Sequence, residues 1–219
     1  VEDLANGLIA ALQTPLGPFF GNTKLADISA VDRLPEMEFH FSLCATSQSA
    51  SSRAIAHAAA ADPTSPFAGY FSDLAEKWGD GKDQQLRGLM TGSIDALLRI
   101  GGAGHPKFFV IDYKSNRLSF ERNPLDHRAY GQDNMRIAME HHHYPLQALL
   151  YCVALHRFLS ARIPDYDITR DLGGAGYLFI RGMVGPSTPL DDQMPNGVFA
   201  WRPSNDTILR VNQILEEGK

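Results

Sequence analysis

Cysteine is scarce in this sequence, and long apolar runs are absent. The 219 residues include two cysteines, Cys44 and Cys152, and neither belongs to a CxxC pair or to a Cys/His cluster with zinc-ligand spacing. This scarcity argues against a disulfide-stabilised scaffold or a zinc finger, and it predicts two buried thiols in a reducing compartment, the cytoplasm. No apolar stretch approaches the roughly 20 residues that a membrane-spanning helix needs.

The beginning of the chain lacks a signal peptide and an initiator methionine. It reads VEDLANGLIAAL, with no basic segment followed by an uninterrupted apolar run, so we expect no secretory signal. The missing methionine, together with the length, suggests a piece of a longer polypeptide. The length of 219 residues suits one domain with a sizeable core, and we predict a single domain over residues 1–219.

The net charge is negative, at −5. Phosphate binding normally relies on lysine and arginine, so this balance disfavours a free-standing DNA-binding protein. A site that gathers carboxylates around a metal ion is itself acidic, however, and other parts of a larger assembly can supply DNA affinity. Bases outnumber acids between residues 99 and 136, which favours this stretch for phosphate contacts, with ordinary surface charge as the equally weighted alternative. The bases are Arg99, Lys107, Lys114, Arg117, Arg122, Arg128 and Arg136.

Helical and strand patterns alternate along the chain. Apolar residues at helical spacing predict helices at residues 2–12, 49–60, 67–78, 126–141, 144–162 and 204–217. Alternating or short apolar runs predict strands at residues 36–44, 92–100, 107–115, 174–181 and 198–201. Residues 116–124 and 182–197 are predicted loops. This order predicts an α/β fold with a small mixed sheet flanked by helices.

Two consecutive predicted strands carry the most specific pattern. They flank a Gly-Gly-Ala-Gly-His-Pro loop, whose turn chemistry predicts a β-hairpin. Side chains alternate along a strand, so Asp112 and Lys114 share one face. If Ile100 and Lys107 close the loop, antiparallel pairing sets Asp95 opposite Asp112, with Cβ atoms roughly 4.5–5.5 Å apart.

Neighbouring carboxylates on otherwise apolar strands repel each other and need a compensating charge. A hard divalent cation supplies it, because Mg²⁺ typically binds one or two protein carboxylates together with phosphate and water oxygens. Lys114 would then hold or help deprotonate a water near a scissile phosphate and stabilise negative charge in the transition state. The alternative is a salt bridge between Asp112 and Lys114 on an edge strand, with Asp95 solvated. The residues alone leave both interpretations open.

A second polar group lies on the predicted helix over residues 144–162. Tyr144, Gln147 and Tyr151 follow the i, i+3, i+7 spacing of one helical face. The rest of this helix is apolar nearly all round, which predicts burial. A buried glutamine needs hydrogen-bond partners. Gln147 and Tyr151 are therefore either a satisfied core pair or residues beside an active site that orient DNA or a metal-bound water.

Weaker motifs receive simpler interpretations. The run His141–His143 predicts a solvated helix junction rather than a metal site. Glu38 and His40 share a strand face from which either could approach a metal, and surface exposure is the favoured interpretation for His40. No complete dinucleotide or P-loop glycine motif is present, so we predict no ATP site.

Several separated motifs occur together in one order along the chain. They are GLMTGSID (88–95), IDYKSN (111–116), YPLQALLY (144–151), ALHRFL (154–159), GAGYLFIRG (174–182) and Arg202-Pro203. This set resembles the C-terminal nuclease domain of the RecB family, the helicase–nuclease subunits of RecBCD or exodeoxyribonuclease V complexes. The likeness spans about Met37 to Pro203 and is firm from Arg87 onward.

The resemblance implies a restriction-endonuclease-like PD-(D/E)xK fold and a metal-dependent exodeoxyribonuclease. Such an enzyme hydrolyses phosphodiester bonds of unwound linear DNA in double-strand-break repair and recombination. The implied partners are single strands of DNA, the helicase part of the same polypeptide and RecC- and RecD-like subunits, with no membrane.

The resemblance also implies roles for individual residues. Asp95 and Asp112 would bind Mg²⁺, for which Mn²⁺ or Ca²⁺ can substitute, and the Tyr113 main-chain carbonyl would be a further ligand. Lys114 would be the catalytic lysine. The remaining implied site residues, which match the family's Q-xxx-Y motif, are Gln147 and Tyr151.

One part of the family pattern is absent. The family has a metal-binding histidine in a G-T-x-x-H context upstream of the first strand, and this sequence has no such motif; His40, within the first predicted strand, does not fit. An incomplete ligand set would weaken metal affinity. A second hypothesis is therefore a catalytically silent module that docks DNA or partner subunits. A third and weaker one is a metal-dependent hydrolase of small phosphate esters.

Overall fold

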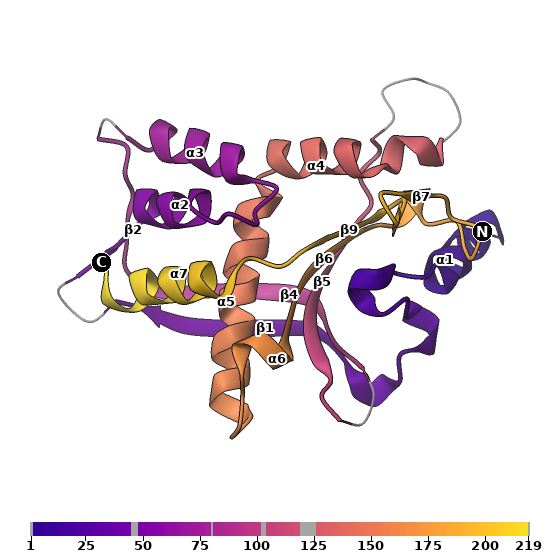
Figure 1. Cartoon of the computed structure of the whole chain (residues 1–219), viewed down its shortest axis with the longest axis horizontal. Coiled ribbons are helices and arrows are strands. Elements are labelled where there is room, and N and C mark those ends of the chain that lie inside the picture. The colour runs from indigo at the N-terminus through magenta and orange to yellow at the C-terminus, as the bar shows by residue number, and fades with distance from the viewer. Residues whose placement is uncertain (1, 45–47, 80, 102–103, 119–125, 219) are drawn as a thin grey trace. The chain divides into compact units, whose positions relative to one another are not determined.

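The computed structural model describes residues 2–44, 48–79, 81–101, 104–118 and 126–218 (Figure 1). The chain divides into two compact units whose segments alternate in sequence. The first unit comprises Val1–Met37, Ile94–Tyr144 and Gly173–Trp201, and the second comprises Glu38–Ser93, Pro145–Leu172 and Arg202–Lys219. The single domain over residues 1–219 stays a prediction.

A five-stranded sheet has the strand order β1-β4-β5-β6-β9. Its strands are β1 (Arg33–Leu43), β4 (Gly88–Ile100), β5 (Lys107–Lys114), β6 (Leu172–Phe179) and β9 (Val198–Trp201). β4 and β5 pair antiparallel, as do β6 and β9. Helices alternate with these strands along the chain, so the predicted α/β class with a small central sheet is confirmed.

The first unit contains two α-helices and five 3-10 turns. These are α1 (Glu2–Gln13), α4 (Gln132–His141), η1 (Pro18–Phe20), η2 (Leu25–Asp27), η3 (Ala30–Asp32), η4 (His127–Tyr130) and η5 (Ile180–Gly182) among the described residues. Inward side chains of β4, β5 and β6 pack with the N-terminal segment. The centre of this core includes Leu16, Phe20, Leu98, Phe109, Ile111 and Leu178. The β4–β5 hairpin is held in place by this core, because each of its two strands contributes buried apolar side chains to it.

The second unit is mostly helical. Its elements include α2 (Ser52–Ala60), α3 (Ala68–Lys77), α6 (Ile168–Asp171), α7 (Asn205–Glu217), the short strands β2 (Ala50–Ser51) and β3 (Gln85–Leu86), and most of α5 (Tyr144–Arg162). Ser51 caps α2 by accepting a hydrogen bond from the Ala54 amide. Ser204 caps α7 by accepting one from the Thr207 amide.

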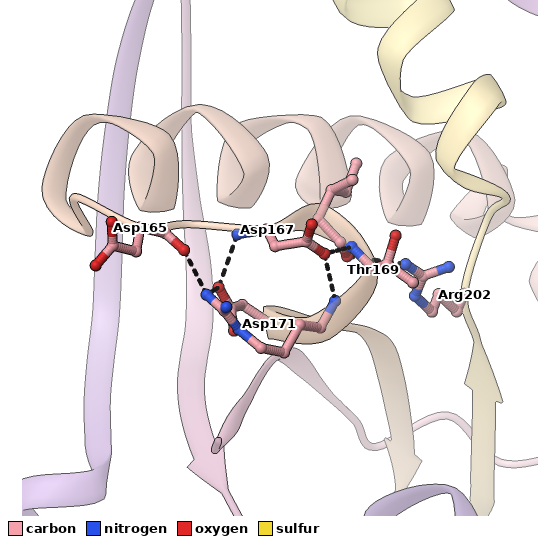
Figure 2. A network of polar contacts seen from close by, with 7 residues as sticks. Asp165, Asp167, Thr169, Asp171 and Arg202 are labelled. Atoms are coloured by element: carbon pink, nitrogen blue, oxygen red, sulfur yellow. Dashed lines mark hydrogen bonds and ion pairs between the residues drawn. The ribbon is translucent and has the colours of Figure 1, made fainter. Parts of the chain in front are cut away.

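A polar network in the second unit anchors the short helix α6 (Figure 2). Asp167 caps it by accepting hydrogen bonds from the Thr169 and Arg170 amides. The Arg170 guanidinium pairs with Asp171, at 2.6 Å. Arg202, which precedes α7, donates to the main-chain carbonyls of Leu172 (2.9 Å) and Ile168 (3.0 Å). Arg202 therefore ties the start of β6 to the segment that leads into α7.

The predicted helix over residues 126–141 is wrong in one respect, because it is broken at Gly131. Gly131 is extended, with η4 before it and α4 after it. The Gln132 amide donates to a carboxylate oxygen of Asp191 at 2.7 Å. Asp191 belongs to a small hairpin of β7 (Leu190–Asp191) and β8 (Met194–Pro195), inside a stretch predicted as loop. The Asp191 carboxylate, distant in sequence, thus accepts a hydrogen bond from a free amide in the first turn of α4 and determines where the helix begins.

Other boundaries differ by a few residues. The strand predicted at 174–181 starts at Leu172 and ends at Phe179, where η5 begins. The predicted loop 116–124 falls largely outside the described residues. The N-terminal helix forms as predicted, but its apolar residues Leu4, Leu8 and Ile9 are exposed. In the described part of the chain no helix is long and apolar enough to cross a membrane.

Candidate active site

The β4–β5 hairpin has the register predicted from its loop. Ile100 lies opposite Lys107, and the ladder runs to Ala96 opposite Ile111. One further step of the same register would set Asp95 opposite Asp112, but the paired ladder ends at Ala96 and Ile111. Beyond Ala96 the Asp95 side chain takes part in the pairing, because a carboxylate oxygen accepts a hydrogen bond from the Tyr113 amide at 2.8 Å.

Asp112 and Lys114 form a close ion pair on one face of β5. The Lys114 Nζ lies 2.5 Å from Oδ1 of Asp112, and the two side chains are 13% and 7% exposed. Both are therefore largely shielded from solvent, unlike the exposed Asp95. The alternative predicted from the sequence is a salt bridge between Asp112 and Lys114 with Asp95 solvated. The salt bridge and the exposed Asp95 are both present, but the pair is buried rather than solvent-exposed.

Burial is the main cause of a raised pKa for the Asp112 carboxyl. The Lys114 ammonium opposes this shift, and the negative charge of Asp95 adds to it. The Asp112 Oδ1 atom is buried and accepts no hydrogen bond of normal geometry within the described residues. The Lys114 ammonium does not fully offset the cost of burying the Asp112 charge, because the pKa stays raised, so a second cation would stabilise this carboxylate.

Lys114 also contacts aromatic rings. Its ammonium lies 3.8 Å from the centroid of the Tyr144 ring and 5.4 Å from that of Tyr177. The Tyr144 ring stacks on Tyr177 and on His142, with centroids 5.6 and 5.3 Å apart. We call His142, Tyr144 and Tyr177 the ring stack. Cation–π contact of this kind fixes the position of an ammonium group without neutralising it.

Gln147 and Tyr151 lie together in the second unit. The Gln147 side-chain amide donates to the Tyr151 hydroxyl at 3.0 Å, which confirms that they share a helical face. The Tyr151 hydroxyl donates in turn to the main-chain carbonyl of Ser93 at 2.7 Å. Ser93 is two residues before Asp95 on β4. Tyr151 therefore binds the backbone of the strand that carries Asp95.

The donor atoms on the hairpin fit a hard divalent cation. In the described part of the chain, no group of three or more His, Cys, Asp or Glu side chains is placed to hold a metal. The hairpin offers two carboxylates, Asp95 and Asp112, and Mg²⁺ commonly uses only one or two of these, with water and phosphate oxygens completing its shell. The buried, incompletely satisfied Oδ1 of Asp112 agrees with this chemistry.

Other sequence predictions have mixed outcomes. His40 is exposed, as predicted, and lies 3.9 Å from Glu38. Both cysteines are free thiols; Cys152 is buried as predicted, but Cys44 is only half-buried because it follows the end of β1. In the predicted basic stretch, Arg99 pairs with Asp32 and Arg136 pairs with acids on α4, while Arg122 lies outside the described residues.

Sequence reasoning missed the role of Tyr177 and of Tyr144 as partners of Lys114. The sequence pattern marks Tyr144 only as the first member of a helical face, and Tyr177 lies in an apolar strand that carries no local pattern for a site. Both contacts join segments distant in sequence. The one available indication was the position of Tyr144 three residues before Gln147.

Comparison with known proteins finds close relatives in one group. The chain is 38% identical over 223 residues to the RecBCD enzyme subunit RecB of Mycolicibacterium smegmatis, a match that covers 98% of the chain. It is 39% identical over 228 residues to that of Mycobacterium tuberculosis (99% of the chain) and 32% identical over 213 residues to that of Escherichia coli (97%).

These relatives are much longer than the chain. The match covers 20% of each mycobacterial subunit and 16% of the Escherichia coli subunit. No protein-family model matches. The chain belongs to the RecB family, and it corresponds to about one fifth of the length of the mycobacterial RecB subunits.

Proposed function

We propose that this chain is the nuclease domain of a RecB-type DNA repair protein and that it hydrolyses phosphodiester bonds of linear DNA with Mg²⁺. The observation that carries the proposal is the buried Asp112–Lys114 pair on a hairpin of a RecB-family chain, with the Asp95 carboxylate accepting a hydrogen bond from the next amide, that of Tyr113. The proposed restriction-endonuclease-like PD-(D/E)xK fold follows from the same residues. The relatives' name, RecBCD enzyme subunit RecB, supports RecC- and RecD-like subunits as partners. The helicase part of the same polypeptide and DNA are further proposed partners.

Each site residue has a proposed task. Asp95 and Asp112 hold the cation, with the Tyr113 main-chain carbonyl as a further ligand. When bound, the metal polarises the phosphate and lowers the pKa of a bound water. Lys114 holds a water or phosphate oxygen and stabilises the negative charge that grows in the transition state. Burial of its side chain strengthens that electrostatic effect, because the surroundings screen charge less than water does.

Gln147 and Tyr151 are proposed to position β4. The Tyr151 hydroxyl fixes the Ser93 carbonyl, and Gln147 orients that hydroxyl by donating to it. A shift of the strand would move the Asp95 carboxylate. A displacement of about 1 Å at a reacting centre can lower a rate by about a hundredfold, so these residues act through Asp95 in the proposal.

The test measures cleavage of linear single-stranded DNA as Mg²⁺ or Mn²⁺ is titrated, with the chain extended upstream to include the family's histidine motif. Asp112→Asn and Lys114→Ala should each lower the rate by roughly a hundredfold to a thousandfold, the loss typical of a group that stabilises transition-state charge. Lys107→Ala is the matched control, because Lys107 is an exposed lysine at the other end of β5. If both site variants cleave as fast as the control, the assigned roles are wrong.

The second candidate function is a catalytically silent docking module. It is favoured by the absence, among the described residues, of a group of three or more metal-binding side chains. It predicts no divalent-cation binding by calorimetry in the extended chain. It also predicts that Asp95→Ala leaves binding of DNA and of RecC-like subunits undiminished. Saturable Ca²⁺ or Mg²⁺ binding that Asp95→Ala abolishes would reject it.

A further inference from the structure

The ring stack continues outward from Lys114 to an exposed side chain. Tyr177 is buried, Tyr144 is half-buried and His142 is exposed. The Lys114 ammonium lies over Tyr144, and the His142 ring stacks on the same tyrosine at an interplanar angle of 22°. An exposed ring is therefore coupled by a single aromatic contact to the proposed catalytic lysine.

Several contacts hold the His142 ring in place. Its Nε2 lies 3.4 Å from the Asn116 amide nitrogen, and its main-chain amide donates to the Ala138 carbonyl at the end of α4. His143, the next residue, has a left-handed backbone conformation (φ 58°) that turns the chain from α4 into α5. The ring of His141 meets that of His142 edge-on, at 4.9 Å. A surface histidine that is fixed in this way loses little conformational entropy when it binds a planar ligand.

Positive charge lies beside the same segment. The Arg181 guanidinium donates to the Ser115 carbonyl at 2.8 Å, one residue after Lys114. The Tyr130 hydroxyl donates to the Asn116 carbonyl at 3.1 Å. Burial raises the pKa of Tyr130, and the charges of Arg181 and Arg117 oppose that rise. Both arginine side chains are exposed. Near the end of β5, exposed arginine side chains therefore accompany the exposed ring of His142.

We propose that His142, backed by Tyr144, is a stacking platform for one nucleobase of single-stranded DNA, next to the nucleotide whose phosphate Lys114 meets. Arg181 contacts the backbone of the same strand. Aromatic rings interleaved with basic groups are the usual means of binding single strands, because every base has a stacking face and every nucleotide a phosphate. In a duplex both faces of an internal base are covered by its neighbours, so the platform favours single strands. This inference rests on the proposed function for the identity of the ligand.

The test measures binding rather than cleavage. A fluorescent single-stranded oligonucleotide is titrated with the 219-residue chain in EDTA, so that no divalent cation supports hydrolysis. Loss of one stacked base lowers affinity by roughly fivefold to 150-fold, and we expect His142→Ala to fall in this range. His142→Phe, which keeps a ring, should bind within about threefold of the wild type. His105→Ala, an exposed histidine in the same unit, is the matched control and should bind like the wild type.

Salt dependence separates stacking from charge. His142→Ala should leave the slope of log affinity against log salt unchanged, whereas Arg181→Ala should reduce it by about 0.7, the value for one phosphate contact on a single strand. An oligonucleotide with 2-aminopurine should show quenched fluorescence on wild-type protein and less quenching on His142→Ala. Equal affinity of the wild type and His142→Ala, or equal losses for His142→Ala and His105→Ala, would overturn the platform.

This experiment is separate from the test of hydrolysis. If the wild type binds single strands through His142 but never cleaves with Mg²⁺, the proposed catalysis is wrong and the platform stands. If the wild type cleaves while His142→Ala binds and cleaves equally well, the catalysis stands and the platform is wrong. Preference of the wild type for duplex over single strands would also contradict the platform.

Discussion

Removing Lys114 should destabilise the protein far more than neutralising Asp112. The two side chains are 13% and 7% exposed and lie 2.5 Å apart, so they form a buried pair. Lys114→Met leaves the Asp112 charge buried beside Asp95, and breaking such a pair costs roughly 3–5 kcal/mol. Asp112→Asn removes the charge that burial disfavours and leaves the ammonium over the Tyr144 ring, a contact worth roughly 0.5–2 kcal/mol. Because burial raises the pKa of Asp112, its charge is already disfavoured in the folded state, so we expect a smaller loss of stability for Asp112→Asn than for Lys114→Met.

The assay is urea unfolding followed by circular dichroism at neutral pH in EDTA. The double variant Asp112→Asn/Lys114→Met should be about as stable as Asp112→Asn alone, because the second change no longer leaves an unpaired charge. The pH dependence has a defined sign. The folded-state pKa of Asp112 is raised, so the unfolded chain loses this proton at lower pH, and stability falls as the pH rises through the folded pKa.

The loss caused by Lys114→Met should consequently shrink as the pH is lowered from neutral, because Asp112 then takes up a proton more readily. Two results would refute the reasoning. One is a loss for Asp112→Asn that equals the loss for Lys114→Met. The other is a Lys114→Met variant as stable as the wild type at neutral pH, which would mean that the Asp112 charge is compensated by something other than the lysine.

Two further predictions concern packing and thiol chemistry. Gly173→Ala would place a methyl group 2.4 Å from the buried Phe109 ring and should lower the free energy of unfolding by roughly 1–3 kcal/mol, measured with denaturant. The control is Gly69→Ala on α3, where no atom lies within 4 Å of the added methyl group, and it should be neutral or stabilising. Equal losses of stability for the two variants would contradict the packing argument. Burial raises the pKa of the Cys152 thiol to about 12, so iodoacetamide at mildly alkaline pH should label the half-buried Cys44 in the folded protein, with Cys152 reacting only after denaturation. Mass spectrometry locates the label, and rapid labelling of Cys152 in the native state would be inconsistent with its burial.

The hairpin register could be predicted because its determinants are local. Strand alternation and the turn chemistry of the loop predict a hairpin in which Ile100 lies opposite Lys107, and the structure confirms that pair; the pairing of Asp95 with Asp112 stays a prediction, because the ladder ends at Ala96 and Ile111. The periodicities also predicted the α/β class and the bounds of α5. These features depend on residues within a few positions of each other.

Features that depend on distant partners could not be predicted. The break at Gly131 arises because a carboxylate on the β7–β8 hairpin satisfies the Gln132 amide. The difference in exposure between Asp95 and Asp112 arises from packing around β5, which alternation within a strand cannot reveal. The contact of Lys114 with Tyr144 joins two elements separated by 30 positions, and no local pattern specifies it.

The interleaving of the two compact units limits how this molecule can be dissected. The chain passes from one unit to the other within β1, within β4, at the first turn of α5, at the start of β6 and at the end of β9. Neither unit is therefore a continuous stretch of polypeptide, and no simple truncation from either end isolates one of them. Rearranging the chain order and adding linkers would be needed to express either half alone. A deletion series should consequently lose folding in large steps rather than trim away one module at a time.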